Sequence, residues 1–400
     1  MANEQSSVGG SQSRSRGRGA PGPLAGLRVI ELAGLGPGPF CAMVLADLGA
    51  EVIRLERVGM PAVSAGSVDR RQVLTRGRQA LGVDLKHERG IELVLRMVEH
   101  ADVLLEGFRP GVLERLGLAP TVCLERNPRL IYGRITGYGQ EGPLAAEAGH
   151  DINYISIAGA LDPIGRRGEA PLPPLNLIAD FGGGGMLLAM GILAAVYERT
   201  RSDLGQVVDA AMVDGAALLT TMFHQMRASS LWNDERGTNS MDSGAHYYNV
   251  YETSDGEFLS VGAMEPHFYR SFMKGLGFSD QNIPPKDDQS QWESLKERVA
   301  AIFRSRTRAE WLATFHGSDA CVTPVLSLGD APTHPHNRER ATFVEVGGIV
   351  EPAPAPRFSR TPSQAPEPAP VPGVHATEEL LRWGLSQPEI DLLVDQGVID

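Results

Sequence analysis

The chain predicts an α/β fold, in which a doubly wound parallel sheet forms a large domain and a smaller α+β domain is inserted into it. Short apolar segments alternate with helical segments in the first half, which is the pattern of βαβ units. The length points to two domains, because 400 residues exceed what one hydrophobic core usually supports. After about Met226 the pattern of polar and apolar residues changes, first to a polar, loop-like segment and then to a pattern typical of a β-hairpin.

The first βαβ unit begins with a strand at Leu27–Leu32, followed by a glycine-rich loop, a helix from about Phe40 to Leu48 and a strand at Glu51–Leu55. The alternation then continues with strands at Gln79–Leu85, Val103–Leu105, Leu130–Ile135 and Gln206–Ala211, and helices at Glu88–Glu99, Val112–Leu116 and Asp214–Met222. Such a sheet binds ligands at the carboxyl ends of its strands. The most apolar run, Met186 to Val196, is about half a membrane span long and predicts a buried helix.

The small α+β domain is expected at residues 244–323. Tyr247–Thr253 and Phe258–Ala263 flank an Asp-Gly pair, which predicts a β-hairpin. Further elements of the second half are helices at about Phe268–Leu276, Trp292–Ser305 and Ala309–Phe315, a strand at Thr323–Leu328, an extended proline-rich arm at Pro352–Pro372, and helices at Glu378–Trp383 and Gln387–Gln396. The large domain would comprise residues 23–226 and 324–400, with a linker at 227–243. Residues 1–22 are rich in Ser, Gly and Arg, and we expect a disordered tail there.

The charge balance limits the classes of partner. With 37 basic and 49 acidic residues, the net charge of −12 argues against nucleic acid or an anionic membrane surface. An anionic ligand would need a local basic patch. The three cysteines, Cys41, Cys123 and Cys321, have no metal-ligand spacing, and we expect free thiols in a reducing compartment. Cys41 is expected to be a buried small residue rather than a nucleophile. The N-terminus lacks the apolar core of a secretory signal, so we expect a cytoplasmic protein.

Two motifs place acid/base groups at loop–helix junctions. In G-H-D-I-N-Y (149–154) His150 stands beside Asp151, and in L-N-L-I-A-D-F-G-G-G-G (175–185) Asp180 precedes a glycine run that opens an apolar helix. A histidine and a carboxylate suit a reaction that needs two acid/base groups around one substrate carbon. Each residue could instead be a helix cap or a core hydrogen-bonding group, and Asp180 is a good N-cap residue. The glycines would allow a ligand to approach closely, with free amides available to an oxyanion.

The loop G-L-G-P-G-P (34–39) raises a rival hypothesis, a dinucleotide-binding fingerprint. Two details exclude it. Pro39 replaces the third glycine of the G-x-G-x-x-G pattern, and Pro37 removes an amide from the phosphate cradle. A Walker-type P-loop, a zinc motif and a G-x-S-x-G elbow are absent from the sequence.

Five motifs occur in one order along the chain: P-L-A-G-L-R-V-I-E-L (23–32), E-G-F-R-P-G (106–111), G-H-D-I-N-Y, P-P-L-N-L-I-A-D-F-G-G-G and G-Q-V-V-D-A-A-M-V-D-G (205–215). This order resembles the family III CoA-transferases and, within them, the branch of the alpha-methylacyl-CoA racemases. The resemblance extends from about Pro23 to the C-terminus. Because five separate motifs are in register, it is specific.

The resemblance implies an isomerase of lipid metabolism that interconverts (2R)- and (2S)-2-methylacyl-CoA thioesters by two-base 1,1-proton transfer through an enolate. His150 and Asp180 would be the two bases, and no metal or organic cofactor would be needed, since CoA is part of the substrate. Family members form interlaced homodimers. The position of Glu265, in G-A-M-E-P, resembles a glutamate that hydrogen-bonds the catalytic histidine from the partner subunit.

Further residues take roles from the same resemblance. Asp151 matches the carboxylate nucleophile of the transferases, but beside His150 it is expected to be structural or to lie near the oxyanion. Tyr154 would share a helical face with His150 and either contact the thioester or pack. Guanidinium groups beyond strand ends can bind the phosphates of CoA, and the candidates are Arg57, Arg76 and Arg109. The alternatives are a CoA-transferase that acts through Asp151 and a non-catalytic CoA-ester binder.

Overall fold

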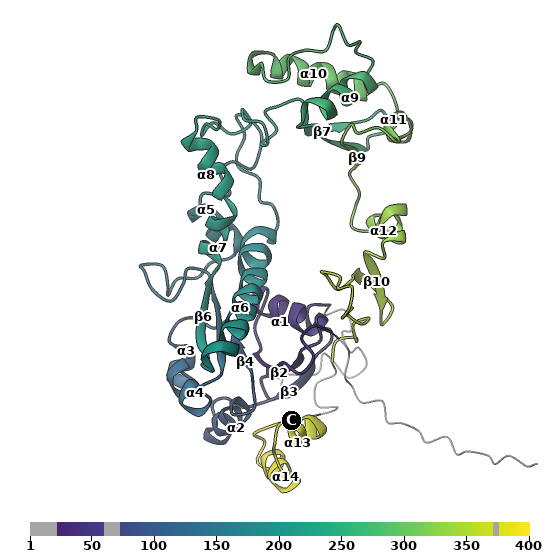
Figure 1. The fold of residues 1–400 in the computed structure, drawn as a ribbon. Coiled ribbons are helices and arrows are strands. Elements are labelled where there is room, and N and C mark those ends of the chain that lie inside the picture. Colours follow the sequence, from purple (N-terminus) through teal and green to yellow (C-terminus); the bar gives the residue numbers. More distant parts are fainter. Residues whose placement is uncertain (1–21, 60–72, 371–375) are drawn as a thin grey trace, which may run out of the picture.

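A parallel β-sheet forms the framework of the larger part of the protein in the computed structural model, which describes residues 22–59, 73–370 and 376–400 (Figure 1). Within these ranges the sheet has six strands in the order β3-β2-β1-β4-β5-β6, and every adjacent pair is parallel. The order reverses between β1 and β4, as in a doubly wound sheet. The predicted parallel sheet is therefore confirmed, whereas the expected tail lies outside the described residues, apart from Gly22.

The strands of this sheet are β1 (Arg28–Leu32), β2 (Glu51–Glu56), β3 (Gln79–Gly82), β4 (Val103–Glu106), β5 (Ile131–Thr136) and β6 (Gln206–Ala211). The helical segments of the large domain are α1 (Pro37–Asp47), η1 (Val73–Thr75), α2 (Glu88–Val98), α3 (Val112–Leu116), α4 (Pro120–Arg126), α5 (Asp151–Ile157), η2 (Leu177–Met186), α6 (Leu187–Ser202), α7 (Met212–Leu219) and α8 (Thr221–Ala228). All residues of β4 and β5 are buried, as expected for strands covered on both faces.

Two apolar cores lie against the sheet. One contains residues of β1, α2 and α4, and the C-terminal helices α13 (Ala376–Arg382) and α14 (Gln387–Asp395) complete it with Leu380 and Ile390. The other contains residues of α1, α5, α6 and η2. Burying one such leucine or isoleucine is worth about 1.5–3 kcal/mol relative to leaving it exposed, so the C-terminal segment is an integral part of the large domain.

Residues between Ala245 and Val322 form a group of helices and strands with its own apolar core (Figure 1), while the domain boundaries stay a prediction. The predicted hairpin is β7 (Tyr248–Glu252) and β8 (Phe258–Gly262), and β9 (Val322–Pro324) adds a third antiparallel strand. The helical segments here are α9 (Pro266–Gly275), η3 (Gln289–Gln291), α10 (Trp292–Phe303) and α11 (Arg308–Phe315). The strand expected at Thr323–Leu328 is thus shorter, and it pairs with β8 in the small sheet rather than with the large one.

Two separate connections join the domains (Figure 1). The first leaves α8, and the second returns through η4 (Ala331–Thr333), α12 (Pro335–Glu339) and a hairpin of β10 (Phe343–Val346) and β11 (Ile349–Pro352). The sequence interpretation missed this hairpin. Gly347 and Gly348, both with positive φ, form its two-residue turn, and a Gly-Gly pair between short apolar segments is a recognisable hairpin signal.

The apolar run Met186–Val196 departs from the prediction of a buried helix. Leu188 and Ile192 of α6 are fully buried, but Met190 is 59% exposed, so only one face of α6 packs on the sheet. The continuous helical segment Leu177–Ser202 is long and apolar enough to cross a membrane by length and composition, and 39% of its most apolar window is buried. The core helix of a soluble protein meets the same criteria.

Candidate functional site

His150 is placed by the turn that opens α5. Its backbone N–H donates to Oδ1 of Asn153 at 3.0 Å, and the backbone N–H of Asn153 donates to the carbonyl oxygen of His150 at 2.8 Å. The first bond, from the N-cap backbone to the side chain of Asn153 at the third helical position, is one half of a capping box, and the second belongs to the backbone of the helical turn. The residue itself is exposed. The backbone of His150 is therefore fixed while its imidazole remains accessible to a ligand.

Asp151 joins the two motifs that carry the predicted bases. Its side chain is buried, and Oδ2 accepts hydrogen bonds from the backbone N–H groups of Ala179, at 2.7 Å, and Asp180, at 2.8 Å. Oδ1 is also buried and has no hydrogen-bond partner among the described residues. Asp151 thus ties the start of α5 to the first turn of η2, which agrees with the structural role expected for it.

Asp180 lies in η2, a π-helical segment that runs directly into α6. The π-helical geometry is rare in proteins, but where it occurs it is often found at a functional site. The carboxylate is partly buried, and Oδ2 accepts a hydrogen bond from the side-chain amide of Asn176 at 3.1 Å. Burial raises the pKa of Asp180 above its ordinary value, and the charge of Asp151 adds to this, while Asn176 and His150 oppose it. Through Asp151, the segment that carries Asp180 is bonded to the start of the helix that carries His150.

The glycine run after Asp180 serves close helix packing, which corrects the expectation that it admits a ligand. A Cβ on Gly183 would lie 2.7 Å from the backbone nitrogen of Ala216 in α7, and one on Gly185 would lie 2.8 Å from the carbonyl oxygen of Pro37. The amides of Ala179 and Asp180, the third and fourth residues of η2, already donate to Asp151, so these two are not free to bind an oxyanion.

Tyr154 supports the turn that carries His150. Its hydroxyl donates to the carbonyl oxygen of Gly149, and its ring packs edge-on against Tyr138 with centroids 5.0 Å apart. A Cβ on Gly149 would lie 2.7 Å from this ring, so glycine is required there. Burial raises the pKa of Tyr154 to about 12. Of the two roles left open by the sequence, the geometry favours packing.

Arg109 lies on the loop after β4. Glu106, at the end of that strand, is buried and accepts hydrogen bonds from the backbone N–H of Phe108 at 2.7 Å and from Nε of Arg134 at 2.8 Å. This fixed carboxylate holds the loop on which Arg109 is exposed. Because Arg109 follows the carboxyl end of β4, it lies at the edge of the parallel sheet where ligands bind in such folds. Arg57 is exposed just after β2.

Arg76 has a different environment from the CoA-binding role expected for it. It is buried, and its guanidinium contacts Asp47 at 2.6 Å, Glu351 at 2.7 Å and the carbonyl oxygen of Pro352 at 2.8 Å. These contacts join α1 to β11, whose Glu351 lies 275 residues after Arg76 in the chain. The geometry thus corrects that expectation and assigns Arg76 to the attachment of the returning connection.

Glu265 is not brought to His150 within one chain. It is exposed at the N-cap position of α9, in the small domain. Figure 1 shows α9 and α5 in separate parts of the molecule. Its role as predicted requires a second chain.

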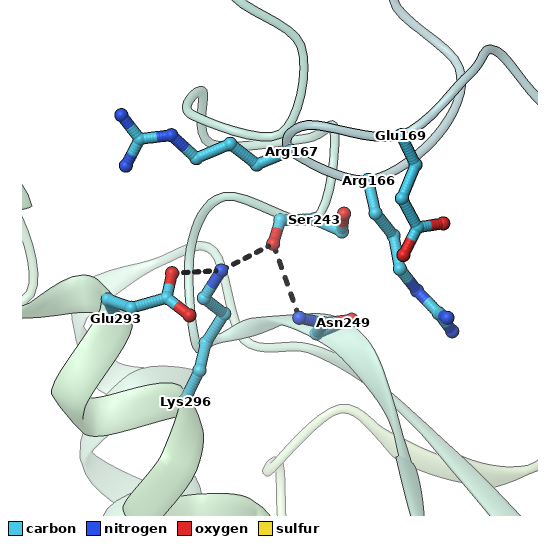
Figure 2. A pocket seen from close by; sticks show the side chains of 7 residues that line it. All are labelled: Arg166, Arg167, Glu169, Ser243, Asn249, Glu293 and Lys296. Atoms are coloured by element: carbon cyan, nitrogen blue, oxygen red, sulfur yellow. Dashed lines mark hydrogen bonds and ion pairs between the residues drawn. The ribbon is translucent and has the colours of Figure 1, made fainter.

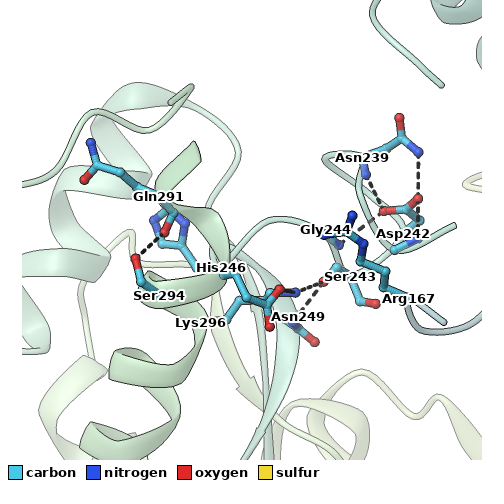
Figure 3. Close-up of polar contacts among 12 residues, drawn as sticks. Arg167, Asn239, Asp242, Ser243, Gly244, His246, Asn249, Gln291, Ser294 and Lys296 are labelled. Carbon is cyan, nitrogen blue, oxygen red and sulfur yellow. Dashed lines mark hydrogen bonds and ion pairs between the residues drawn. The ribbon is translucent and has the colours of Figure 1, made fainter. Parts of the chain in front are cut away.

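The sequence interpretation missed two cavities beside the first connection. One, of about 340 Å³, is lined by Arg166, Arg167, Glu169, Ser243, Asn249, Glu293 and Lys296 (Figure 2). Lys296 bridges Glu293 at 2.8 Å and the carbonyl oxygen of Ser243 at 3.4 Å. The other, of about 320 Å³, contains Asp242, whose carboxylate accepts from the amides of Asn239 and Gly244 (Figure 3). Neither cavity is lined by His150, Asp180 or Glu265.

The cysteines are free thiols, as predicted. Cys41 and Cys123 are buried and Cys321 is exposed. Burial raises the pKa of Cys41 well above its ordinary value, which fits a packing residue rather than a nucleophile. Among the described residues no group of three or more His, Cys, Asp or Glu side chains is placed to hold a metal ion.

Comparison with known proteins agrees with this architecture. The family described as CoA-transferase family III matches residues 24–376. A Mus musculus protein named alpha-methylacyl-CoA racemase is 48% identical over 94% of this chain and 97% of its own length, and a Homo sapiens protein of the same name is 46% identical over the same shares. The crystal structure of a CAIB/BAIF family protein from Brucella suis superposes with a TM-score of 0.78, at 25% identity over 90% of this chain and 99% of its own.

A doubly wound sheet with a histidine and an aspartate at one end is thus found in a chain that matches a known family over most of its length. The chain belongs to CoA-transferase family III.

Proposed function

We propose that this protein is a racemase of 2-methylacyl-CoA thioesters that exchanges the proton at C2 between two bases, His150 and Asp180. The observation that carries the proposal is their joint placement. His150 opens α5, Asp180 lies in η2, and the buried carboxylate of Asp151 ties the two elements together. The two relatives of highest identity described above are named racemases of this type.

The reaction follows from that placement. One base takes the proton from C2, the electron pair of the C–H bond moves toward the thioester carbonyl, and the other base donates a proton to the opposite face of the enolate. A base is most effective when its pKa lies near the working pH. The raised pKa of Asp180 moves its carboxyl group in that direction, so the same group can accept a proton in one reaction direction and donate it in the other. No metal or organic cofactor is needed for these steps.

The alternative transferase would use Asp151 as a nucleophile. Its Oδ2 accepts two backbone hydrogen bonds, and Oδ1, which has no hydrogen-bond partner among the described residues, is buried as well, so an acyl group could reach either oxygen only if the residues that cover the side chain moved. The carboxylate of Asp151 is thus bound to the protein, whereas His150 is exposed to a ligand. This contrast favours the racemase.

Glu265 completes the proposed site from a second chain. The exposed faces of α6, α7 and α8 carry apolar side chains that a second copy of the chain would cover: Met190, Leu218, Leu219 and Met222. Because the small domain stands apart from α5, an interlaced homodimer would bring Glu265 of one chain to His150 of the other. An acceptor on one imidazole nitrogen fixes the tautomer and raises the basicity of the other nitrogen. Arg109 and Arg57 would bind the phosphates of CoA.

The experiment uses one enantiomer of a 2-methylacyl-CoA in deuterated buffer, with and without an added carboxylic acid. Deuterium at C2 together with loss of optical activity is the expected result. Transfer of CoA to the added acid without exchange at C2 would contradict the proposal in favour of a transferase. Binding of the thioester with neither reaction would indicate a CoA-ester binding protein.

A further inference from the structure

A buried charge bridge lies beneath the loop between β1 and α1. Glu31 is fully buried in β1, and its two carboxylate oxygens pair with the guanidinium groups of Arg54 and Arg78. Arg54 faces Glu31 directly in the register between β2 and β1, and Arg78 immediately precedes β3. Both arginines are buried. A buried ion pair is costly to assemble unless its hydrogen-bonding geometry is good, so such a bridge needs an explanation.

The two arginines also hold the loop at both ends. Nη2 of Arg54 donates to the carbonyl oxygen of Gly34 at 3.3 Å, and Nη2 of Arg78 donates to that of Pro39 at 2.7 Å. Glu31, between them, sets the separation of the two guanidinium groups. The segment Gly34–Pro39, which comprises the loop after β1 and the first residues of α1, is therefore attached to the sheet at both of its ends, and Leu35 between them is exposed.

The middle of this segment lies against Asp180. Gly36, with φ of 64°, is so close that a Cβ built on it would lie 3.6 Å from Oδ2 of Asp180. Just beyond the loop, the rings of Phe40 and Phe181 pack with centroids 4.8 Å apart. The loop is thus a wall beside one of the two proposed bases. None of the contacts that place His150 involves this loop.

We propose that Arg54, Glu31 and Arg78 are positioning residues, which hold the Gly34–Pro39 segment against Asp180 and thereby set the geometry of proton transfer on the Asp180 face of the substrate. The inference rests on the function proposed above and deepens it. It predicts that a substitution in the bridge slows proton exchange at C2 more on the Asp180 face of the substrate than on the opposite face. A purely structural role would lower the activity on both faces together.

The test measures C2 deuterium exchange separately from each enantiomer of a 2-methylacyl-CoA. The Asp180-dependent enantiomer is defined as the one whose exchange is lost in Asp180→Ala. Arg78→Lys keeps the charge beside Glu31, but an ammonium group cannot span both Glu31 and the carbonyl of Pro39 as the guanidinium fork does. Because a displacement of about 1 Å can cost up to a hundredfold in rate, we expect exchange of the Asp180-dependent enantiomer to fall about tenfold, and that of the other enantiomer to change less than about twofold.

Arg199→Lys is the matched control. Arg199 is also buried, and it bridges the carboxylate of Asp102 at 2.8 Å and the carbonyl oxygen of Arg129 at 2.9 Å, away from the loop. The same substitution there should lower the melting temperature without changing the ratio of the two exchange rates. Arg54→Lys, which weakens the contact with Gly34, should reproduce the asymmetry of Arg78→Lys.

The outcomes separate the inference from the function on which it rests. Equal losses for both enantiomers in Arg78→Lys, unchanged rates, or the same asymmetry in Arg199→Lys would overturn the positioning role while leaving the racemase in place. Absence of C2 exchange in the unmodified protein would overturn the proposed function itself, and the inference with it.

Discussion

The side chain of Asp151 accepts a hydrogen bond from the backbone N–H of Asp180, at 2.8 Å. One member of the G-H-D motif is thereby bonded to the residue that is expected to be the second base. Because the same oxygen also accepts from Ala179, the first turn of η2 cannot shift without breaking two buried hydrogen bonds. The distance between His150 and Asp180 is consequently set by a residue that need not touch the substrate.

Replacing Asp151 tests that role. Asp151→Ala would leave two amides unpaired, and we expect the free energy of unfolding to fall by about 2 kcal/mol, the order of cost for a buried unsatisfied polar group. Asp151→Asn keeps an acceptor oxygen in place, so it should retain most of the stability and a measurable part of the racemisation. Denaturant unfolding and polarimetry measure both effects. An acyl or CoA adduct on Asp151, detected by mass spectrometry, would show that Asp151 is instead a nucleophile.

Two arginines that look equivalent in the sequence should behave differently. Arg76→Lys should lower the free energy of unfolding by roughly 2 kcal/mol, since one ammonium cannot serve Asp47, Glu351 and the carbonyl of Pro352 together. Arg109→Met should leave the melting temperature unchanged and raise KM for the thioester about tenfold, the loss of one charge-assisted contact. Thermal melts and steady-state kinetics on both variants distinguish a structural role of the arginine from a role in binding the thioester. A raised KM with an unchanged melting temperature in Arg76→Lys would contradict the assignment.

The pH dependence should report on Asp180. Because burial raises its pKa, the rate of exchange that begins with Asp180 as base should decline on the acid side at a pH above the ordinary aspartate value of 3.8. A raised pKa in the folded state favours the protonated form, so the stability it contributes is present below the ordinary pKa and is lost as the pH rises through the raised value. Asp180→Asn should therefore be more stable than the unmodified protein at pH 7, and the difference should shrink on acidification. Unfolding curves at several pH values test this, and a pH-independent difference would count against it.

Subunit mixing tests the shared site. Inactive His150→Ala chains and weakened Glu265→Ala chains are refolded together and the heterodimers purified. If Glu265 acts across the interface, one site in each heterodimer combines an intact His150 with an intact Glu265 from the other chain, and activity returns to about half of the unmodified value. Proven heterodimers without recovered activity would place Glu265 outside the site. His150→Ala chains refolded alone are the control.

The alternation of short apolar and helical segments was enough to predict the parallel sheet, because strands such as β4 and β5 are buried on both faces and leave a continuous apolar signal. The hairpin of the small domain was predictable from its Asp-Gly turn. For α6, the sequence predicted the helix but not which of its faces is buried. Apolar composition alone does not distinguish a face that packs on the sheet, such as that of Leu188, from one that remains exposed, such as that of Met190.

In the candidate site, local sequence patterns do not predict the role of a residue when that role depends on a contact distant in sequence. His150 and Asp180 were predicted from motifs, and Asp151 bonds the segment of one to that of the other, but the roles of Arg76 and Arg78, two residues apart, could not be assigned from position. Arg76 pairs with Glu351, and Arg78 pairs with Glu31, so the role of each depends on a contact distant in sequence. The glycine run after Asp180 was misinterpreted for the same reason, since only the packed structure shows α7 and Pro37 against it.

The central claim is that His150 and Asp180 serve opposite faces of C2, and isotope exchange with separate enantiomers tests it most directly. His150→Ala and Asp180→Ala are each incubated in deuterated buffer with pure (2R) and pure (2S) thioester, and deuterium at C2 is followed by mass spectrometry. We predict that each variant loses racemisation by at least about a hundredfold, in line with the loss of one acid/base group. Each should still exchange deuterium into one enantiomer, and the two variants should retain opposite enantiomers. Retention of the same enantiomer by both variants, or near-normal racemisation by either, would contradict the two-base site.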